Sequence, residues 1–82
     1  MSVEAKNSDR LRQMAEKLGA LTEDDFQLLT GTTAATVEAW RKRGTGPAYV
    51  RMGNRYYYPV AAVADYMVRQ QRAPKVQANP LL

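Results

Sequence analysis

Hydrophobic residues recur at helical spacing in the first quarter of the chain. Four apolar side chains fall on nearly one side of such a helix: Leu11, Met14, Leu18 and Leu21. Ser8 or Asp9 can cap its start, and Gly19 suits its end. We therefore expect an accessory helix over residues 9–18.

A shorter helix is expected directly after the first. Thr22 supplies a capping hydroxyl, and the carboxylates of residues 23–25 follow in the first turn, where the helix dipole favours negative charge. Phe26 and Leu29 would form the buried side of this helix. Gly31 then interrupts the pattern.

The next helix has clear start and stop signals. Thr33 can cap it and Gly44 can end it, which predicts a helix over residues 34–43 with Val37 and Trp40 on its buried side. Two short helices joined by a tight, glycine-containing turn are typical of a helix-turn-helix.

Two strand-like segments, residues 49–52 and 56–58, surround Gly53-Asn54 and predict a hairpin. Its register has two solutions. A two-residue turn would set Met52 opposite Arg55 and would mix charged and apolar groups on each face. A loop of residues 53–55 would instead gather the apolar groups on one face.

We favour this three-residue loop, because so small a sheet must bury one side. Met52 would then lie opposite Tyr56, and Val50 opposite Tyr58. The remaining side chains would be free of the core: Arg51 and Tyr57 facing outward, Asn54 and Arg55 at the tip of the hairpin.

A last helix is expected from Pro59, whose missing N–H costs nothing at a first helical position. Val60, Val63 and Met67 recur at helical spacing, with an end near Arg72. The fold class is therefore α+β: a small winged helix-turn-helix over residues 21–72, with an extra N-terminal helix in residues 1–20 and a flexible tail over residues 73–82.

The composition limits the kinds of functional site that the chain can form. A chain of 82 residues has room for one domain, and the absence of cysteine and histidine removes disulfides and the commonest metal ligands. We interpret the carboxylates of residues 23–25 as a helix start and not as a metal or acid/base site. We therefore expect no enzyme activity and no cofactor.

Neither a membrane span nor a secretory signal is predicted. No apolar run approaches about 18 residues, and charged Glu4, Lys6 and Asp9 occupy the place of a signal-peptide core. We expect a cytoplasmic protein with no membrane partner.

Charge is segregated along the chain, which the net charge of +4 understates. Residues 1–40 hold four basic and seven acidic side chains, a net charge of −3, whereas residues 41–82 hold eight basic side chains against Asp65 alone, a net charge of +7. The basic end is the one expected to meet a polyanion.

These positions predict a surface for double-stranded DNA. On helix 34–43, the side opposite Val37 carries Ala35, Glu38, Ala39 and Lys42, with Thr36, Arg41 and Arg43 on the flanks. The alanines allow close approach to base edges, and Glu38 can accept from a cytosine amino group. Thr36 and the basic residues suit phosphates, as do Arg51 and Arg55 on the hairpin.

Simpler interpretations stay open for several of these residues. The run of residues 41–43 can be a solvated helix end that the dipole favours, and Thr36 can be an inert helix residue. Trp40 and the tyrosines fit a core better than a base-stacking surface, with Tyr57 as the exception.

The chain resembles the AlpA-type regulators and phage excisionases, which belong to the MerR-like winged-helix superfamily. The resemblance covers about residues 21–68 and rests on residues 29–40, Gly44, Gly46-Pro47, residues 50–53 and Tyr58, ahead of Val63 and Tyr66. Ala62 departs from the family, since an acidic residue often opens the last helix there. The helix before residue 20 is also extra.

The resemblance implies that helix 34–43 enters the major groove, that the hairpin is the wing, and that six residues have DNA roles by position: Thr33, Thr36, Arg41, Arg43, Arg51 and Arg55. It implies an excisionase or a small transcriptional regulator of a phage or other mobile element. Few of these side chains read bases, so we expect self-association on DNA, DNA bending or a partner to supply specificity. The alternative is an adaptor that recruits an integrase, a polymerase or a packaging enzyme through its N-terminal helix or its tail.

Overall fold

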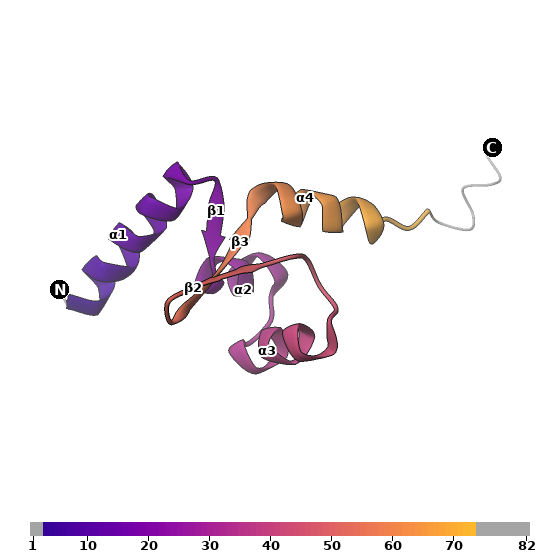
Figure 1. The fold of residues 1–82 in the computed structure, drawn as a ribbon, viewed down its shortest axis with the longest axis horizontal. Coiled ribbons are helices and arrows are strands. Elements are labelled where there is room, and N and C mark those ends of the chain that lie inside the picture. Colours follow the sequence, from indigo (N-terminus) through magenta and orange to yellow (C-terminus); the bar gives the residue numbers. More distant parts are fainter. Residues whose placement is uncertain (1–2, 74–82) are drawn as a thin grey trace.

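The structure is a computed structural model that describes residues 3–73 (Figure 1). Its elements are α1 (Val3–Lys17), β1 (Ala20–Thr22), α2 (Glu23–Thr30), α3 (Ala34–Arg43), β2 (Val50–Met52), β3 (Arg55–Pro59) and α4 (Val60–Arg69). Within this range the fold is α+β, with four helices and a three-stranded antiparallel sheet. The tail predicted from residue 73 onward lies, apart from Ala73, outside the described residues.

Helix α1 begins at Val3, and the predicted start at residue 9 is wrong. No glycine or proline interrupts the chain before Gly19, so Ser8 and Asp9 continue the helix instead of capping it. The buried contact comes from Ala15, whereas Met14 and Leu18 are exposed. The apolar stripe predicted for this helix is therefore only partly covered.

The predicted ends of α2 and α3 are confirmed. The hydroxyls of Thr22 and Thr33 each accept a hydrogen bond from the backbone N–H three residues on, at 3.2 and 3.3 Å. Gly31 and Gly44 follow the two helices with φ of 68° and 73°, in the left-handed region that glycine adopts at little cost.

A third strand, β1, joins the hairpin and makes β3 the centre of the sheet, in the order β1-β3-β2. Leu21 lies opposite Tyr58 in this pairing. Three residues are too short to show the alternation that marks a strand, and the partner strand is distant in sequence. The strand pattern in the sequence therefore missed β1.

The hairpin register that we predicted is wrong. Met52 lies opposite Arg55 and Arg51 opposite Tyr56, so the turn has two residues, Gly53 and Asn54. Gly53 has a φ of 63°, and among the described residues only glycines have positive φ, which gives the signs of a type II′ turn. The two-residue turn, whose geometry matches the twist of the strands, therefore decides the register, although the other register would have gathered the apolar side chains on one face.

This register decides which hairpin residues face the helices. Arg51 shares a face with Tyr56 and Tyr58, because alternate residues of a strand point to the same side. The prediction that Arg51 faces outward with Tyr57 is therefore wrong. Arg55 begins β3 instead of lying in the turn, and its side chain is on the opposite face.

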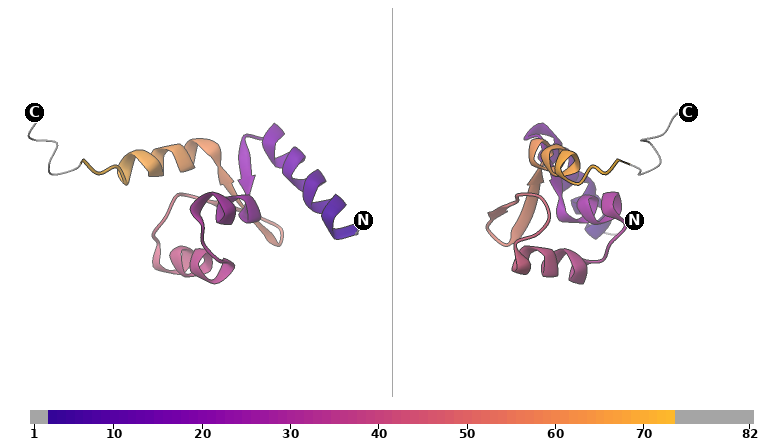
Figure 2. Two further views of the ribbon diagram at one scale, coloured as in Figure 1. Left: turned by 180° about the vertical axis from the view of Figure 1, so that it is seen from behind. Right: turned by 90° about the vertical axis from the view of Figure 1, so that its right-hand side faces the viewer.

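The core lies where the sheet, α2, α3 and the first turns of α4 meet (Figure 2). Its buried residues are Phe26, Val37, Tyr58 and Val63, with Leu21 and Trp40 packed against them. The rings of Phe26 and Tyr58 stack with centroids 4.1 Å apart. Leu29, predicted to be buried beside Phe26, is 62% exposed, so this part of the prediction is wrong.

Helix α4 begins at Val60, since Pro59 ends β3 instead of opening the helix, and it ends at Arg69. Val63 is buried, whereas Val60 and Met67 are exposed. In Figure 1 and in the left view of Figure 2, α4 runs away from the sheet, so its later turns lie beyond the core.

Candidate nucleic-acid interface

Helix α3 is held at its start by two threonines and along its length by one buried residue. Thr33 Oγ1 accepts from Thr36 N and donates to Thr36 Oγ1 at 3.2 Å, so the two hydroxyls bond to each other. Val37 is completely buried. This anchor turns the opposite side of α3 toward solvent.

The exposed side of α3 carries most of the residues predicted for base edges and phosphates. Ala35, Glu38, Lys42 and Arg43 are exposed, and Ala39 is half-buried. Lys42 Nζ lies 3.3 Å from Glu38 Oε2, one helical turn away, in a pair that is open to solvent. Such a pair is weak and exchanges readily with other charges.

The side chain of Arg41 points into the fold and not toward solvent. Its side chain is only 12% exposed, and Nη1 donates to Glu23 Oε1 and to the Tyr58 hydroxyl, each at 2.9 Å. Its guanidinium carbon lies 3.7 Å from the centre of the Tyr56 ring. Of the basic run at residues 41–43, only Lys42 and Arg43 are thus exposed.

This arrangement shifts the ionisation of two groups. Burial alone would lower the pKa of Arg41, but the Tyr58 hydroxyl and the Glu23 charge outweigh burial and raise it. Burial raises the pKa of Tyr58, against the opposing effect of Arg41. Arg41 therefore stays charged and Tyr58 stays neutral well above neutral pH.

Arg51 lies on the hairpin face that looks toward α3. Its Nε donates to the carbonyl of Gly53 at 3.1 Å, and its guanidinium carbon is 5.8 Å from the centre of the Tyr56 ring. The side chain is exposed. Arg51 is thus on the same side of the molecule as the exposed residues of α3.

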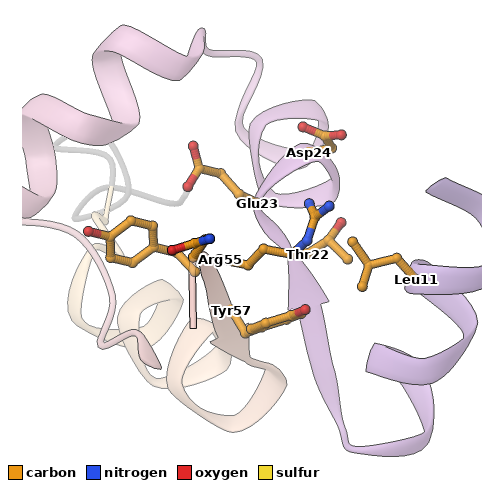
Figure 3. Close-up of a pocket in the computed structure, with 8 residues that line it drawn as sticks. Leu11, Thr22, Glu23, Asp24, Arg55 and Tyr57 are labelled. Atoms are coloured by element: carbon orange, nitrogen blue, oxygen red, sulfur yellow. The ribbon is translucent and has the colours of Figure 1, made fainter. Parts of the chain in front are cut away.

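Arg55 occupies the other face, in a pocket of about 190 Å³. Figure 3 shows its guanidinium turned back from the hairpin toward Thr22 and Asp24, with Tyr57 and Leu11 on either side. Asn54, in the turn, is exposed and also lines this pocket. Arg51 and Arg55, predicted as neighbours on one surface, therefore point to different sides.

A cleft of about 310 Å³ lies between α3 and the hairpin, and we call it the α3–hairpin cleft. It is lined by Glu38, Arg41, Lys42, Tyr49 and Tyr56. The two tyrosines were missed as site residues, because the sequence analysis assigned every tyrosine except Tyr57 to the core. A two-residue turn would have placed both with Tyr58 on the face toward α3.

Two of the three acidic residues at the start of α2 are in ion pairs. Glu23 pairs with Arg41, and Asp25 lies 3.1 Å from Arg12 of α1. Within residues 3–73, no group of three or more acidic side chains is arranged to hold a metal ion. These carboxylates tie α1 and α3 to α2.

Comparison of the chain with protein-family models, with curated proteins and with solved structures gave no match. The resemblance to excisionases therefore stays a prediction. In the part of the chain that the structure describes, no helix is long and apolar enough to cross a membrane.

Proposed function

We propose that the protein is a small winged helix-turn-helix that binds double-stranded DNA. In this proposal α2 and α3 form the helix-turn-helix, α3 enters the major groove, and the β2–β3 hairpin is the wing. The order of the elements and the position of the hairpin beside α3 support this assignment.

The exposed side of α3 together with Arg51 is the observation on which the proposal rests. Lys42 and Arg43 end the helix, and Arg51 on the hairpin has its guanidinium carbon 5.8 Å from the ring of Tyr56, which lines the α3–hairpin cleft together with Lys42. When α3 lies in the major groove of a duplex, one sugar-phosphate backbone of that duplex lies next to the wing. These cations are placed to meet that strand.

The proposed interface differs from the predicted one in three residues. We keep Ala35, Glu38 and Ala39 for base edges, Thr33, Lys42, Arg43 and Arg51 for phosphates, and Asn54 for the wing tip. Arg41 and Arg55 leave the set of phosphate contacts, since the first is bonded internally and the second points to the other face. Thr36 is the third residue that leaves the set, since its hydroxyl and its backbone N–H are both bonded to the Thr33 hydroxyl.

We infer a role on mobile-element DNA, as an excisionase or a small transcriptional regulator, from the resemblance over residues 21–68. Ala35 and Ala39 offer no side-chain hydrogen bonds, so Glu38 is the main base reader on the exposed side of α3. Sequence choice then depends on several copies on DNA, on DNA bending, or on a partner such as an integrase.

Titration of a fluorescent duplex at several salt concentrations tests the proposal. The triple variant Lys42→Ala, Arg43→Ala, Arg51→Ala should reduce the slope of log Kobs against log salt by about 0.9 for each phosphate that the variant no longer neutralises. Lys17→Ala, which removes an exposed cation from α1, is the control and should leave the slope unchanged. Absence of duplex binding at low salt, or equal slopes for all proteins, would refute the proposal.

A second function is supported by the exposed apolar side chains of α1. Met14 and Leu18 are exposed although they lie near the sheet end of the helix, and this supports the use of α1 as a contact for a protein partner. An adaptor of this kind would recruit the integrase of the same element. The double variant Met14→Gln, Leu18→Gln should then abolish integrase binding without weakening the binding of DNA.

A further inference from the structure

Three elements of the fold meet at one side chain, that of Arg41. It projects from α3, it bonds to Glu23 at the first position of α2, and it bonds to Tyr58 in the central strand of the sheet. Its guanidinium also lies against the Tyr56 ring at 3.7 Å. A single side chain therefore joins α2, α3 and β3.

The backbone packing of α3 makes this junction important. Helix α3 packs mainly against α2, whereas the hairpin packs against β1 and α2. Contacts between α3 and the hairpin are therefore made by side chains. Arg41 makes the charged ones, to Tyr58 and Tyr56 of β3. Only a planar cation with several donors can stack on one ring while it bonds to both a carboxylate and a hydroxyl.

We propose that Arg41 is a positioning residue for DNA binding, which sets the orientation of α3 relative to the hairpin without contacting a phosphate. This inference rests on the proposed DNA-binding function. Two elements that read one duplex must keep a fixed separation, because small displacements remove contacts at one of them. Arg41 lines the α3–hairpin cleft between them and so fixes its width.

The sign of a charge effect gives the sharpest test. Glu23→Gln removes a negative charge, which by electrostatics alone should strengthen DNA binding. The same change removes the charged partner of Arg41 and loosens the junction. If Arg41 acts by position, Glu23→Gln should weaken duplex binding about tenfold at a temperature where the variant is fully folded.

Asp24→Asn is the matched control. Asp24 is the next residue along α2 and is exposed, and the carboxylate that Arg41 pairs with is Glu23. Its substitution changes the net charge by the same amount as Glu23→Gln. We expect Asp24→Asn to bind DNA as tightly as the unmodified protein or slightly more tightly.

The salt dependence separates a positioning residue from a phosphate contact. Arg41→Met should lower the affinity about tenfold with an unchanged slope of log Kobs against log salt, whereas Lys42→Met should reduce the slope by about 0.9. Arg41→Lys should not restore the affinity, because lysine cannot make the same contacts. If Arg41→Met does not fold, Tyr58→Phe keeps the charge of Arg41 and should also weaken binding.

Two results would overturn the inference while leaving the proposed function intact. One is a Glu23→Gln protein that binds as tightly as Asp24→Asn. The other is an Arg41→Met protein whose salt slope falls as it does for Lys42→Met. An unmodified protein that binds no duplex refutes the proposed function itself, and with it any role of Arg41 in DNA binding.

Discussion

Single side chains in this protein have different roles although they look alike in the sequence. Arg41 and Lys42 are neighbours of the same charge, yet one bonds to Glu23 and Tyr58 inside the fold and the other ends in solvent. The helical angle between successive residues causes the difference. Of these two neighbouring cations, one makes structural bonds inside the fold and the other makes only a solvent-exposed ion pair with Glu38.

Glu38 should act as a selectivity residue of the proposed interface. Its carboxylate repels phosphates and holds Lys42 at 3.3 Å, but it can accept from a cytosine amino group. We therefore expect Glu38→Gln to bind random duplex more tightly and to lose discrimination worth about 1–3 kcal/mol at one cytosine. Selection from a random duplex library, with binding constants for the recovered sequences, measures both effects.

Glu16→Gln is the control for Glu38→Gln, since Glu16 is an exposed carboxylate on α1. It should leave the selected sequences unchanged. If Glu38→Gln selects the same sequences as the unmodified protein, Glu38 does not read a base.

Tyr58 should make stability depend on pH in the alkaline range. Burial raises the pKa of its phenol above the ordinary value near 10, so the folded state favours the neutral form more than the unfolded state does. The free energy of unfolding should be constant up to about pH 9 and should fall as the pH rises through the pKa of the folded state.

Urea unfolding between pH 7 and pH 11 measures this dependence, and Tyr58→Phe should reduce the alkaline slope. Tyr57→Phe is the control, because Tyr57 lies on the other face of the sheet. Equal slopes for the two variants would show that another group controls the transition.

At the scale of elements, short helices and strands depend on a few contacts each. Over residues 7–17, whose side chains the structure describes, α1 buries Ala15 and makes the ion pair from Arg12 to Asp25 at 3.1 Å. The N–H of Val60 donates to Gly19 O at 2.8 Å, so the turn after α1 is joined to the start of α4. The extra N-terminal helix is thus attached to the fold.

Ala15→Asp tests how α1 is attached. A carboxylate at this position would be buried without a cationic partner, which should lower the free energy of unfolding by several kcal/mol. Gln13→Asp, at an exposed position of the same helix, should cost about 0.5 kcal/mol or less. Thermal unfolding followed by circular dichroism distinguishes the two. Similar costs would mean that α1 does not pack as the structure has it.

At the scale of the whole molecule, one small cluster holds the sheet and the helices together. Phe26 stacks on Tyr58 and meets the Trp40 ring edge-on with centroids 6.2 Å apart. The cluster has four buried side chains among the described residues, those of Phe26, Val37, Tyr58 and Val63. Such a small core leaves little reserve of stability.

Phe26→Ala should therefore unfold the protein at 37 °C. Loss of a buried phenylalanine costs about 3–5 kcal/mol, comparable to the whole stability of many small domains. Leu29→Ala is the control on the same helix, and its exposed side chain should contribute about 0.5 kcal/mol or less. Urea titration gives both values. A large cost for Leu29→Ala would restore the sequence prediction that Leu29 is buried.

The helix caps and helix ends could be predicted from the sequence alone. The caps at Thr22 and Thr33 and the ends at Gly31 and Gly44 were predicted correctly, because each depends on hydrogen bonds and dihedral angles within a few residues. The same locality explains why the bounds of α3 match residues 34–43.

Only the tertiary structure decided the remaining features, since each depends on groups far apart in the chain. The strand β1 exists because β3 pairs with it, and Arg41 is internal because Glu23 and Tyr58 come within 2.9 Å of it. The hairpin register followed the turn at Gly53 and not the apolar pattern. The sequence by itself determined helix ends and segregated charge, and the packing of distant residues decided which cations face solvent.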